Sequence, residues 1–312
     1  MGIPTIPAME LTSTQRRTLE LLIGTGRPPH EEPGLADRIR TAIEDRLAEE
    51  DMPAADLPPI WVGKRRLQEQ DRCEGLLQAG LLGEGPPFEH SAGSAAGTLF
   101  HKAIEIDVAT ERGFDARTVC DRAVERLGSD GAFAGFWGGI DPFDRAEVLL
   151  DAGRRLTLFR DSFPPLQRRW AAQPEFRLRY PLAGGRVVLS GAPDLVLGRT
   201  RRLVIDFKSG GAWPEHAEDM RFYALLIALR CGVAPYRVAT FFLDSGEWQA
   251  EDVTGRVLER AAERTVSTVL SSWRVLRGQA PVLRPGRHCA RCPRRSGCPA
   301  VTSGSGAGGA AA

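Results

Sequence analysis

Residues 191–210 read GAPDLVLGRTRRLVIDFKSG and contain two short apolar runs separated by a Gly-Arg-Thr-Arg turn. Apolar runs on either side of such a turn predict an antiparallel hairpin. Side chains alternate along a strand, so Asp206 and Lys208 are expected on one face and the apolar residues between and before them on the other. Asp194 opens the first run, and antiparallel pairing is expected to bring its carboxylate close to that of Asp206.

This hairpin lies within a longer β-rich segment. Residues 175–210 contain a second turn signal at Gly184-Gly185. The two turns together predict a three-stranded antiparallel meander. Periodic apolar positions predict helices before and after it, and two more strands. The helices are expected at Ser13–Ile23, Gly34–Glu50, 63–82, 93–113, Asp115–Leu127, Arg145–Ser162, Glu215–Arg230 and Gly255–Arg277, and the strands at 236–246 and 247–253. This order predicts an α/β (α+β) fold with a central mixed sheet flanked by helices.

The composition of the 312-residue chain narrows the class of protein. Hydrophobic residues make up 42%, enough for a sizeable core, and 41 basic residues against 40 acidic ones predict no particular partner. The sequence shows neither a bilayer-spanning apolar run nor a signal peptide, so a cytoplasmic location is expected. In a reducing compartment, six cysteines favour a metal site or isolated thiols over disulfides.

The two acids and the lysine of the hairpin suit metal-dependent chemistry on a phosphate. Clustered carboxylates repel one another unless a cation lies between them, and hard oxygen ligands favour Mg²⁺ or Mn²⁺. Such an ion lowers the pKa of a bound water, and Lys208 can orient that water or oppose negative charge. The alternative for Asp206 and Lys208 is a simple ion pair on an exposed strand.

Pro193-Asp194 followed by Asp206-Phe207-Lys208 resembles the motif of PD-(D/E)XK nucleases, and the context resembles their RecB-like branch. The resemblance implies a restriction-endonuclease-like core. It also implies that Asp194, Asp206 and a helix histidine, His101 in GTLFH, hold the catalytic metals, and that Lys208 is the catalytic lysine. Glu175, which opens the meander, is similar to a further acidic position of the branch, here expected to contact substrate.

The helix after the lysine carries a glutamine and a tyrosine one turn apart in this branch. Tyr223 is similar to that tyrosine and is expected to bind substrate, but Asp219 stands at the glutamine position. Arg221 on the same helix is a further candidate for binding a phosphate. The alternative for Tyr223 is a packing role at the edge of the core.

Cysteines bracket the predicted nuclease core. Cys289, Cys292 and Cys298 lie in a loop rich in Pro, Arg and Gly, and three such thiols require a fourth ligand. With Cys73 they resemble the set that holds a structural [4Fe–4S] cluster in some RecB-like nucleases, with the last three on a C-terminal lid. A structural zinc ion, bound with either Cys73 or His288, is the alternative.

These motifs predict four regions: a helical extension over 1–60, a nuclease core over 61–280, a cluster segment over 281–300 and a disordered tail over 301–312. The expected activity is cleavage of DNA, as an exonuclease on single strands or ends, in repair, recombination or CRISPR adaptation. The chain also resembles CRISPR-associated RecB-like exonucleases and the nuclease domains of helicase–nuclease complexes. This resemblance implies a helicase or a CRISPR-adaptation protein as partner. The alternative is a non-catalytic DNA-binding or scaffold module of such a complex.

Overall fold

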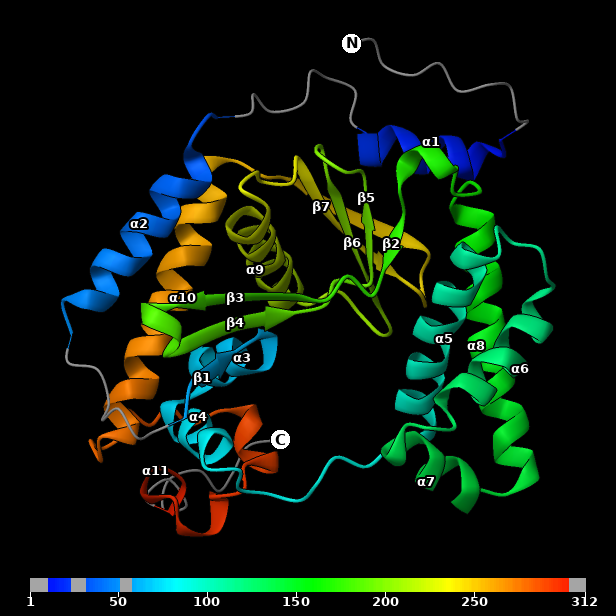
Figure 1. The fold of residues 1–312 in the computed structure, drawn as a ribbon. Coiled ribbons are helices and arrows are strands. Elements are labelled where there is room, and N and C mark those ends of the chain that lie inside the picture. Colours follow the sequence, from blue (N-terminus) through cyan, green and yellow to red (C-terminus); the bar gives the residue numbers. More distant parts are fainter. Residues whose placement is uncertain (1–10, 24–31, 51–57, 303–312) are drawn as a thin grey trace, which may run out of the picture.

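A computed structural model describes residues 11–23, 32–50 and 58–302, and the chain forms helices and two small sheets there (Figure 1). The α-helices are α1 (Ser13–Ile23), α2 (Leu35–Ala48), α3 (Lys64–Arg72), α4 (Glu74–Leu81), α5 (Ala92–Ala109), α6 (Ala116–Leu127), α7 (Gly131–Gly139), α8 (Pro142–Ser162), α9 (Pro214–Cys231), α10 (Gly255–Leu276) and α11 (Pro299–Thr302). The strands are β1 (Ile60–Val62), β2 (Gln173–Pro174), β3 (Leu178–Leu182), β4 (Val187–Gly191), β5 (Leu195–Leu197), β6 (Leu203–Lys208), β7 (Arg237–Phe242) and β8 (Glu247–Asp252).

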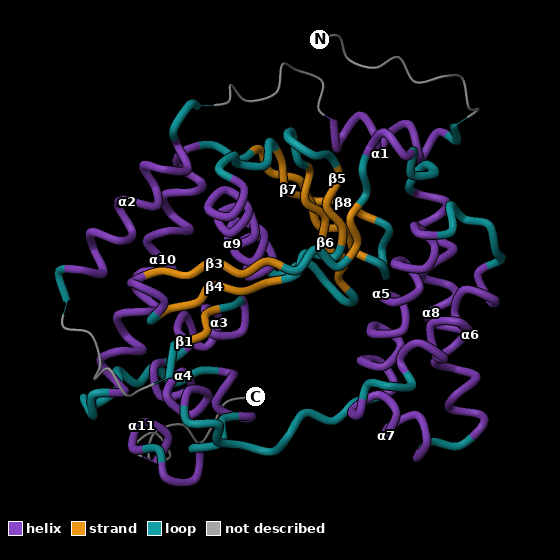
Figure 2. The backbone as a smooth tube through the Cα atoms, in the orientation of Figure 1, coloured by secondary structure: helices purple, strands orange, loops and turns teal. Residues whose placement is uncertain are grey.

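The strands form two sheets that meet near the middle of the molecule (Figure 2). The larger sheet has the order β2-β5-β6-β7-β8, with β6 and β7 parallel and its other pairs antiparallel. The smaller sheet has the order β1-β4-β3, with β1 parallel to β4. Both sheets are therefore mixed, and the α/β prediction is confirmed.

Helices cover both faces of the larger sheet, with α2, α9 and α10 on one side and α5, α6 and α8 on the other (Figure 1). The central strand β6 contributes to both cores. Val204 packs with the first group of helices, whereas Ile205 and Phe207 pack with the second. By strand alternation, Asp206 and Lys208 lie on the same face as Val204.

The predicted three-stranded meander is wrong in one respect: its strands belong to two sheets. The hairpin arms that contain β3 and β4 continue into β2 and β5, and Glu175 N–H still donates to the Asp194 carbonyl (2.9 Å) where they bend. Pro193 has no N–H to donate to a ladder, and Glu175 has a positive φ of 49°. These two residues turn the arms, so β3 and β4 leave the larger sheet.

The described part of residues 1–60 packs against the core. Ile39, Ile43 and Leu47 of α2 are buried in the same apolar cluster as α9 and α10. Leu22 of α1 is buried in the opposite cluster, and its carbonyl accepts a hydrogen bond from the Tyr236 hydroxyl (3.4 Å). Both helices therefore extend the core. Most of the predicted tail, residues 303–312, lies outside the described residues.

Two local features differ from the expectation. The single helix predicted over 63–82 is two helices, α3 and α4, because the backbone of Cys73 is extended between them. Helix α7 was not expected, because four of its nine residues are glycine and its periodicity is weak. Among the described helices, none has both the length and the apolar run that crossing a bilayer requires.

Candidate active site

Asp206 and Lys208 form an ion pair on one face of β6, as strand alternation predicts. Lys208 Nζ lies 2.6 Å from Asp206 Oδ2, and the Asp206 side chain is only 1% exposed. Burial alone would raise the pKa of Asp206, but the ammonium groups of Lys64 and Lys208 outweigh it and lower the pKa to about 2. The carboxylate is thus buried and ionised at neutral pH, while the side chain of Lys208 is partly exposed.

Asp194 lies beside this pair, at the point where the two sheets part. Its Oδ2 accepts a hydrogen bond from the backbone N–H of Phe207 (2.6 Å). Its Oδ1 lies 3.2 Å from His101 Nδ1. The hairpin therefore places Asp194 next to Asp206, and its carboxylate reaches across to the helix that carries the histidine.

Helix α5 presents His101 to the hairpin. The helix begins with a capping box, in which Ser91 and Ser94 bond to each other's backbone N–H groups. One residue before the histidine, the Phe100 ring packs edge-on against Phe207 with 5.5 Å between centroids. This contact fixes α5 against β6 and so sets the distance from His101 to the acids.

His101, Glu175 and Asp194 form a group of potential metal ligands. Each offers one donor atom, and these atoms all lie within 4.8 Å of one another. A ring nitrogen with two carboxylates suits Mn²⁺ or Mg²⁺. Asp206 lies outside this group and pairs with lysines. Glu175, which was expected to contact substrate, is instead a member of the donor group.

The charges of this group are coupled. Burial would lower the pKa of His101, but the Asp194 carboxylate outweighs burial and raises it. Burial and the nearby Asp194 charge both raise the pKa of Glu175. The carboxylates of Glu175 and Asp194 therefore repel each other, and a bound cation would offset this repulsion.

Lys64, which the sequence interpretation missed, contacts the other oxygen of the Asp206 carboxylate. Its Nζ lies 3.4 Å from Asp206 Oδ1 and 4.6 Å from the centroid of the Tyr223 ring. Burial would lower the pKa of Lys64, but the Asp206 and Asp194 charges outweigh it and raise the pKa. A separation of 142 residues gives no local signal for this contact.

The three candidates on α9 are engaged within the protein. Tyr223 is buried, and its hydroxyl donates to the Ala192 carbonyl (2.9 Å), which supports the hairpin beside Asp194. Asp219 is buried and accepts from Gln68 Nε2 (3.0 Å). Arg221 binds Glu251 (2.9 Å) and Glu218 (2.5 Å). Substrate contacts by Tyr223 and Arg221 remain predictions.

The cysteine-rich segment packs beside Cys73. Arg284 N–H donates to Cys73 Sγ (3.4 Å), and Gly286 N–H donates to Cys289 Sγ (3.4 Å). Residues 282–286 thus connect the fourth predicted cysteine to the loop that holds the others, Cys292 and Cys298. In the described ranges, no three cysteine sulfurs lie within 4.8 Å of one another.

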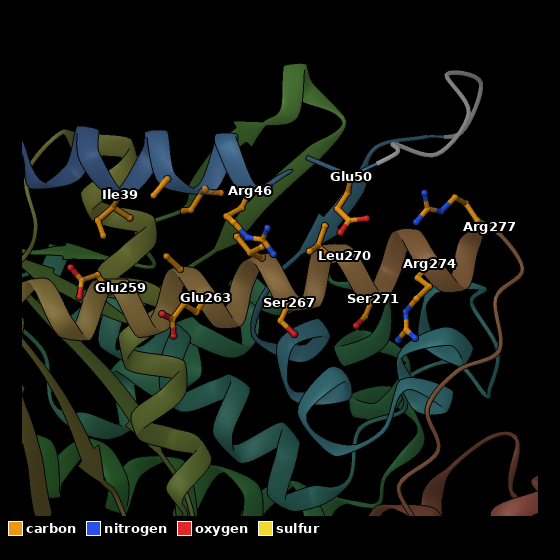
Figure 3. A pocket seen from close by; sticks show the side chains of 14 residues that line it. Ile39, Arg46, Glu50, Glu259, Glu263, Ser267, Leu270, Ser271, Arg274 and Arg277 are labelled. Carbon is orange, nitrogen blue, oxygen red and sulfur yellow. The ribbon is translucent and has the colours of Figure 1, made fainter. Parts of the chain in front are cut away.

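A groove on the protein lies away from these residues. It has a volume of about 730 Å³ and lies between α2 and α10, lined by side chains such as Ile39, Leu270 and Arg274 (Figure 3). None of the candidate site residues lines it. The candidate active site, defined by its donor atoms, therefore does not coincide with this groove.

A mixed sheet flanked by helices, with Pro-Asp and Asp-x-Lys on one hairpin beside a nitrogen–oxygen donor group, defines a nuclease core of the restriction-endonuclease type. The family model of the PD-(D/E)XK nuclease superfamily matches residues 76–299. The chain belongs to the PD-(D/E)XK nuclease superfamily. Lys64 and Cys73 precede the matched range.

The solved structures that match the chain include two of low sequence identity. The crystal structure of SSO0001 is 14% identical, with 85% of this chain and 95% of that chain covered and a TM-score of 0.35. A protein from Eubacterium rectale named "Putative exonuclease" is 11% identical, with 81% and 91% covered and a TM-score of 0.48. No curated protein matches the chain.

Proposed function

We propose that the protein is a divalent-metal-dependent deoxyribonuclease of the RecB-like branch, acting as an exonuclease on single-stranded DNA or DNA ends. The observation that carries this proposal is the convergence of His101, Glu175 and Asp194 beside the Asp206–Lys208 pair. A non-catalytic scaffold would need none of these charges, and burying them together is unfavourable without a ligand.

The proposed division of labour follows from the geometry. His101, Glu175 and Asp194 would hold Mg²⁺ or Mn²⁺, with Asp206 as the further ligand that the family resemblance implies; the ion when bound stabilises negative charge on the phosphate and lowers the pKa of water. Lys208, 2.6 Å from Asp206, orients the attacking water and offsets charge that develops on the phosphate. The buried neighbours of β6 keep both side chains in place.

An exposed aromatic surface supports a single-stranded substrate. Trp61 of β1 is 48% exposed, and the Arg179 guanidinium lies 5.1 Å from the centroid of its ring. Unpaired bases stack on such rings, and arginines bind the backbone that links them. Trp61 stands three residues before Lys64, and we propose that a bound strand passes over both. Any unwinding would come from a partner, such as a helicase or a CRISPR-adaptation protein.

We also propose that Cys73, Cys289, Cys292 and Cys298 hold a structural [4Fe–4S] cluster, with zinc as the alternative. Arg284 N–H donates to Cys73 Sγ and Gly286 N–H donates to Cys289 Sγ, so one short segment contacts both thiols, which supports a shared site for the four cysteines. Protein purified without oxygen should be brown and contain iron and sulfide. The Cys73→Ala variant should lose both, whereas Cys120→Ala, at a buried cysteine of the α5–α6 core, should retain them. Zinc without iron would refute the cluster.

Cleavage by a Lys208→Ala variant tests the activity. End-labelled single- and double-stranded DNA is incubated with and without Mn²⁺, and the wild type should release nucleotides from the single strand. Lys208→Ala should lose cleavage while its thermal unfolding remains cooperative. Lys102→Ala is the matched control, because Lys102 pairs with Glu105 on α5. Full activity of Lys208→Ala would exclude the proposed role.

A further inference from the structure

Lysine is rare in this chain. Only three of its 41 basic residues are lysines, namely Lys64, Lys102 and Lys208. Two of them, Lys64 and Lys208, approach the same buried carboxylate of Asp206. Arginine is a wide planar fork, whereas lysine is a compact charge on a flexible stem. Where arginine serves at almost every other basic position, two lysines on one carboxylate indicate a need for compact ammonium groups.

The start of α3 holds Lys64 in a defined position. Strand β1 runs parallel to β4, and Gly63 follows it directly. A Cβ atom at Gly63 would lie 2.9 Å from the Ser190 carbonyl oxygen, so a larger residue would push the strand away. The ammonium group then lies over the Tyr223 ring, and a cation over an aromatic face is attracted to it.

Lys64 helps to keep the Asp206 carboxylate ionised, but it is not the closest cation to that group. Lys208 already pairs with Oδ2 of that carboxylate at 2.6 Å, whereas Lys64 approaches Oδ1 at 3.4 Å. The Lys64 side chain is 26% exposed, while that of Asp206 is 1% exposed. Part of the Lys64 side chain, like that of Lys208 (21% exposed), is therefore accessible to an anion that enters the site.

We propose that Lys64 is a second substrate-binding lysine, which contacts a phosphate of the nucleic-acid strand beside Asp206 Oδ1, while Lys208 lies at Oδ2. This inference rests on the proposed nuclease function. The two lysines approach different oxygens of one carboxylate, so a strand that passes the donor group can meet both ammonium groups. The resulting phosphate contact orients the strand relative to His101, Glu175 and Asp194.

The salt dependence of binding tests this contact. Each phosphate contact to a single strand contributes about 0.7 to the slope of log K against log salt. Binding of a fluorescein-labelled 20-nucleotide oligothymidylate is measured by anisotropy at several NaCl concentrations, with Ca²⁺ in place of Mn²⁺. Lys64→Met should lower the slope by about 0.7 and raise KM for Mn²⁺-dependent cleavage. Lys102→Met, with a side chain of similar exposure (25%), should do neither.

A conservative variant separates substrate contact from structural support. Lys64→Arg keeps the charge and should retain the wild-type salt slope, but its wider group should slow cleavage at saturating DNA. A wild-type slope and KM in Lys64→Met would overturn the inference while leaving the nuclease assignment intact. If Lys64→Met fails to fold, unchanged cleavage kinetics in Lys64→Arg would overturn it. A wild type that neither binds nor cleaves the oligonucleotide would refute the proposed function itself, and the inference with it.

Discussion

The buried carboxylate of Glu74 is expected to stabilise the junction between α4, α10 and the segment that leads to the cysteines. Its Oε1 accepts from the Ser271 hydroxyl (3.0 Å), and it forms an ion pair with Arg274. Its Oε2 accepts from Val282 N–H (2.7 Å). Because Glu74 directly follows Cys73, losing this carboxylate should weaken the packing of α4 and the contact of residues 282–286 with Cys73.

The cost of Glu74→Gln follows from these contacts. Breaking a buried ion pair costs about 3–5 kcal/mol, and we expect about 3 kcal/mol because glutamine keeps the shape and one acceptor. An unfolding entropy of about 2.1 cal/mol/K per residue gives roughly 0.65 kcal/mol/K for this chain. The melting temperature of Glu74→Gln should therefore be about 5 °C lower at neutral pH.

The difference should close in acid. Burial would raise the pKa of Glu74, but the hydrogen bonds from Val282 and Ser271 and the Arg274 charge outweigh it and lower the pKa below its ordinary 4.5. A carboxyl with a lowered pKa in the folded state stabilises the protein above its unfolded pKa. This contribution is lost as the pH falls below 4.5 towards the folded value.

Thermal unfolding followed by circular dichroism between pH 7 and pH 3 measures this difference. Glu84→Gln is the control, since Glu84 pairs with Arg294 at the surface and its loss should shift the melting temperature less. Equal melting temperatures for wild type and Glu74→Gln at pH 7 would refute the reasoning. A gap of constant size down to pH 3 would refute the titration of Glu74 as its source.

Three further variants test the packing and the substrate surface. Trp61→Ala should weaken oligothymidylate binding in the anisotropy assay by about 1–3 kcal/mol, the value of one stacked base, whereas Phe143→Ala, at a ring 71% exposed on α8, should not. Phe207→Ala should cost about 3–5 kcal/mol in urea unfolding, because its ring packs edge-on against those of Phe100, Phe159 and Phe241; a cost below about 1 kcal/mol would contradict this packing. Gly191→Ala should cost about 1–3 kcal/mol, since its Cβ would lie 2.8 Å from the Tyr223 ring, and a neutral effect would show that this ring can move.

The hairpin could be predicted from sequence because its signals are local. Alternation over six residues places Asp206 and Lys208 on one face, and the turn length sets Asp194 opposite. The periodic helices were predicted to within a few residues for the same reason. The weakly periodic glycine-rich helix α7 carries no such signal, and it was missed.

Contacts between distant segments could not be predicted in this way. Lys64 meets Asp206 only because β1 pairs with β4, and a three-residue strand has too few residues to reveal its partner. The burial of Tyr223 likewise depends on α9 packing beneath β4. One signal for Lys64 was nonetheless present in the composition, namely the scarcity of lysine in a chain rich in arginine.

The bend in the hairpin explains why the donor atoms meet. If the two arms continued as one flat ladder, strand alternation would decide which face of the sheet Glu175 and Asp194 point to. Helix α5 would cover only one of the two faces. Pro193 ends the regular pairing, and the positive φ of Glu175 turns the opposite arm at the same level. Both carboxylates then reach the edge of the larger sheet, where His101 approaches from α5. The proline of the motif therefore has a structural task distinct from that of the aspartate: it creates the bend at which the aspartate meets its partners.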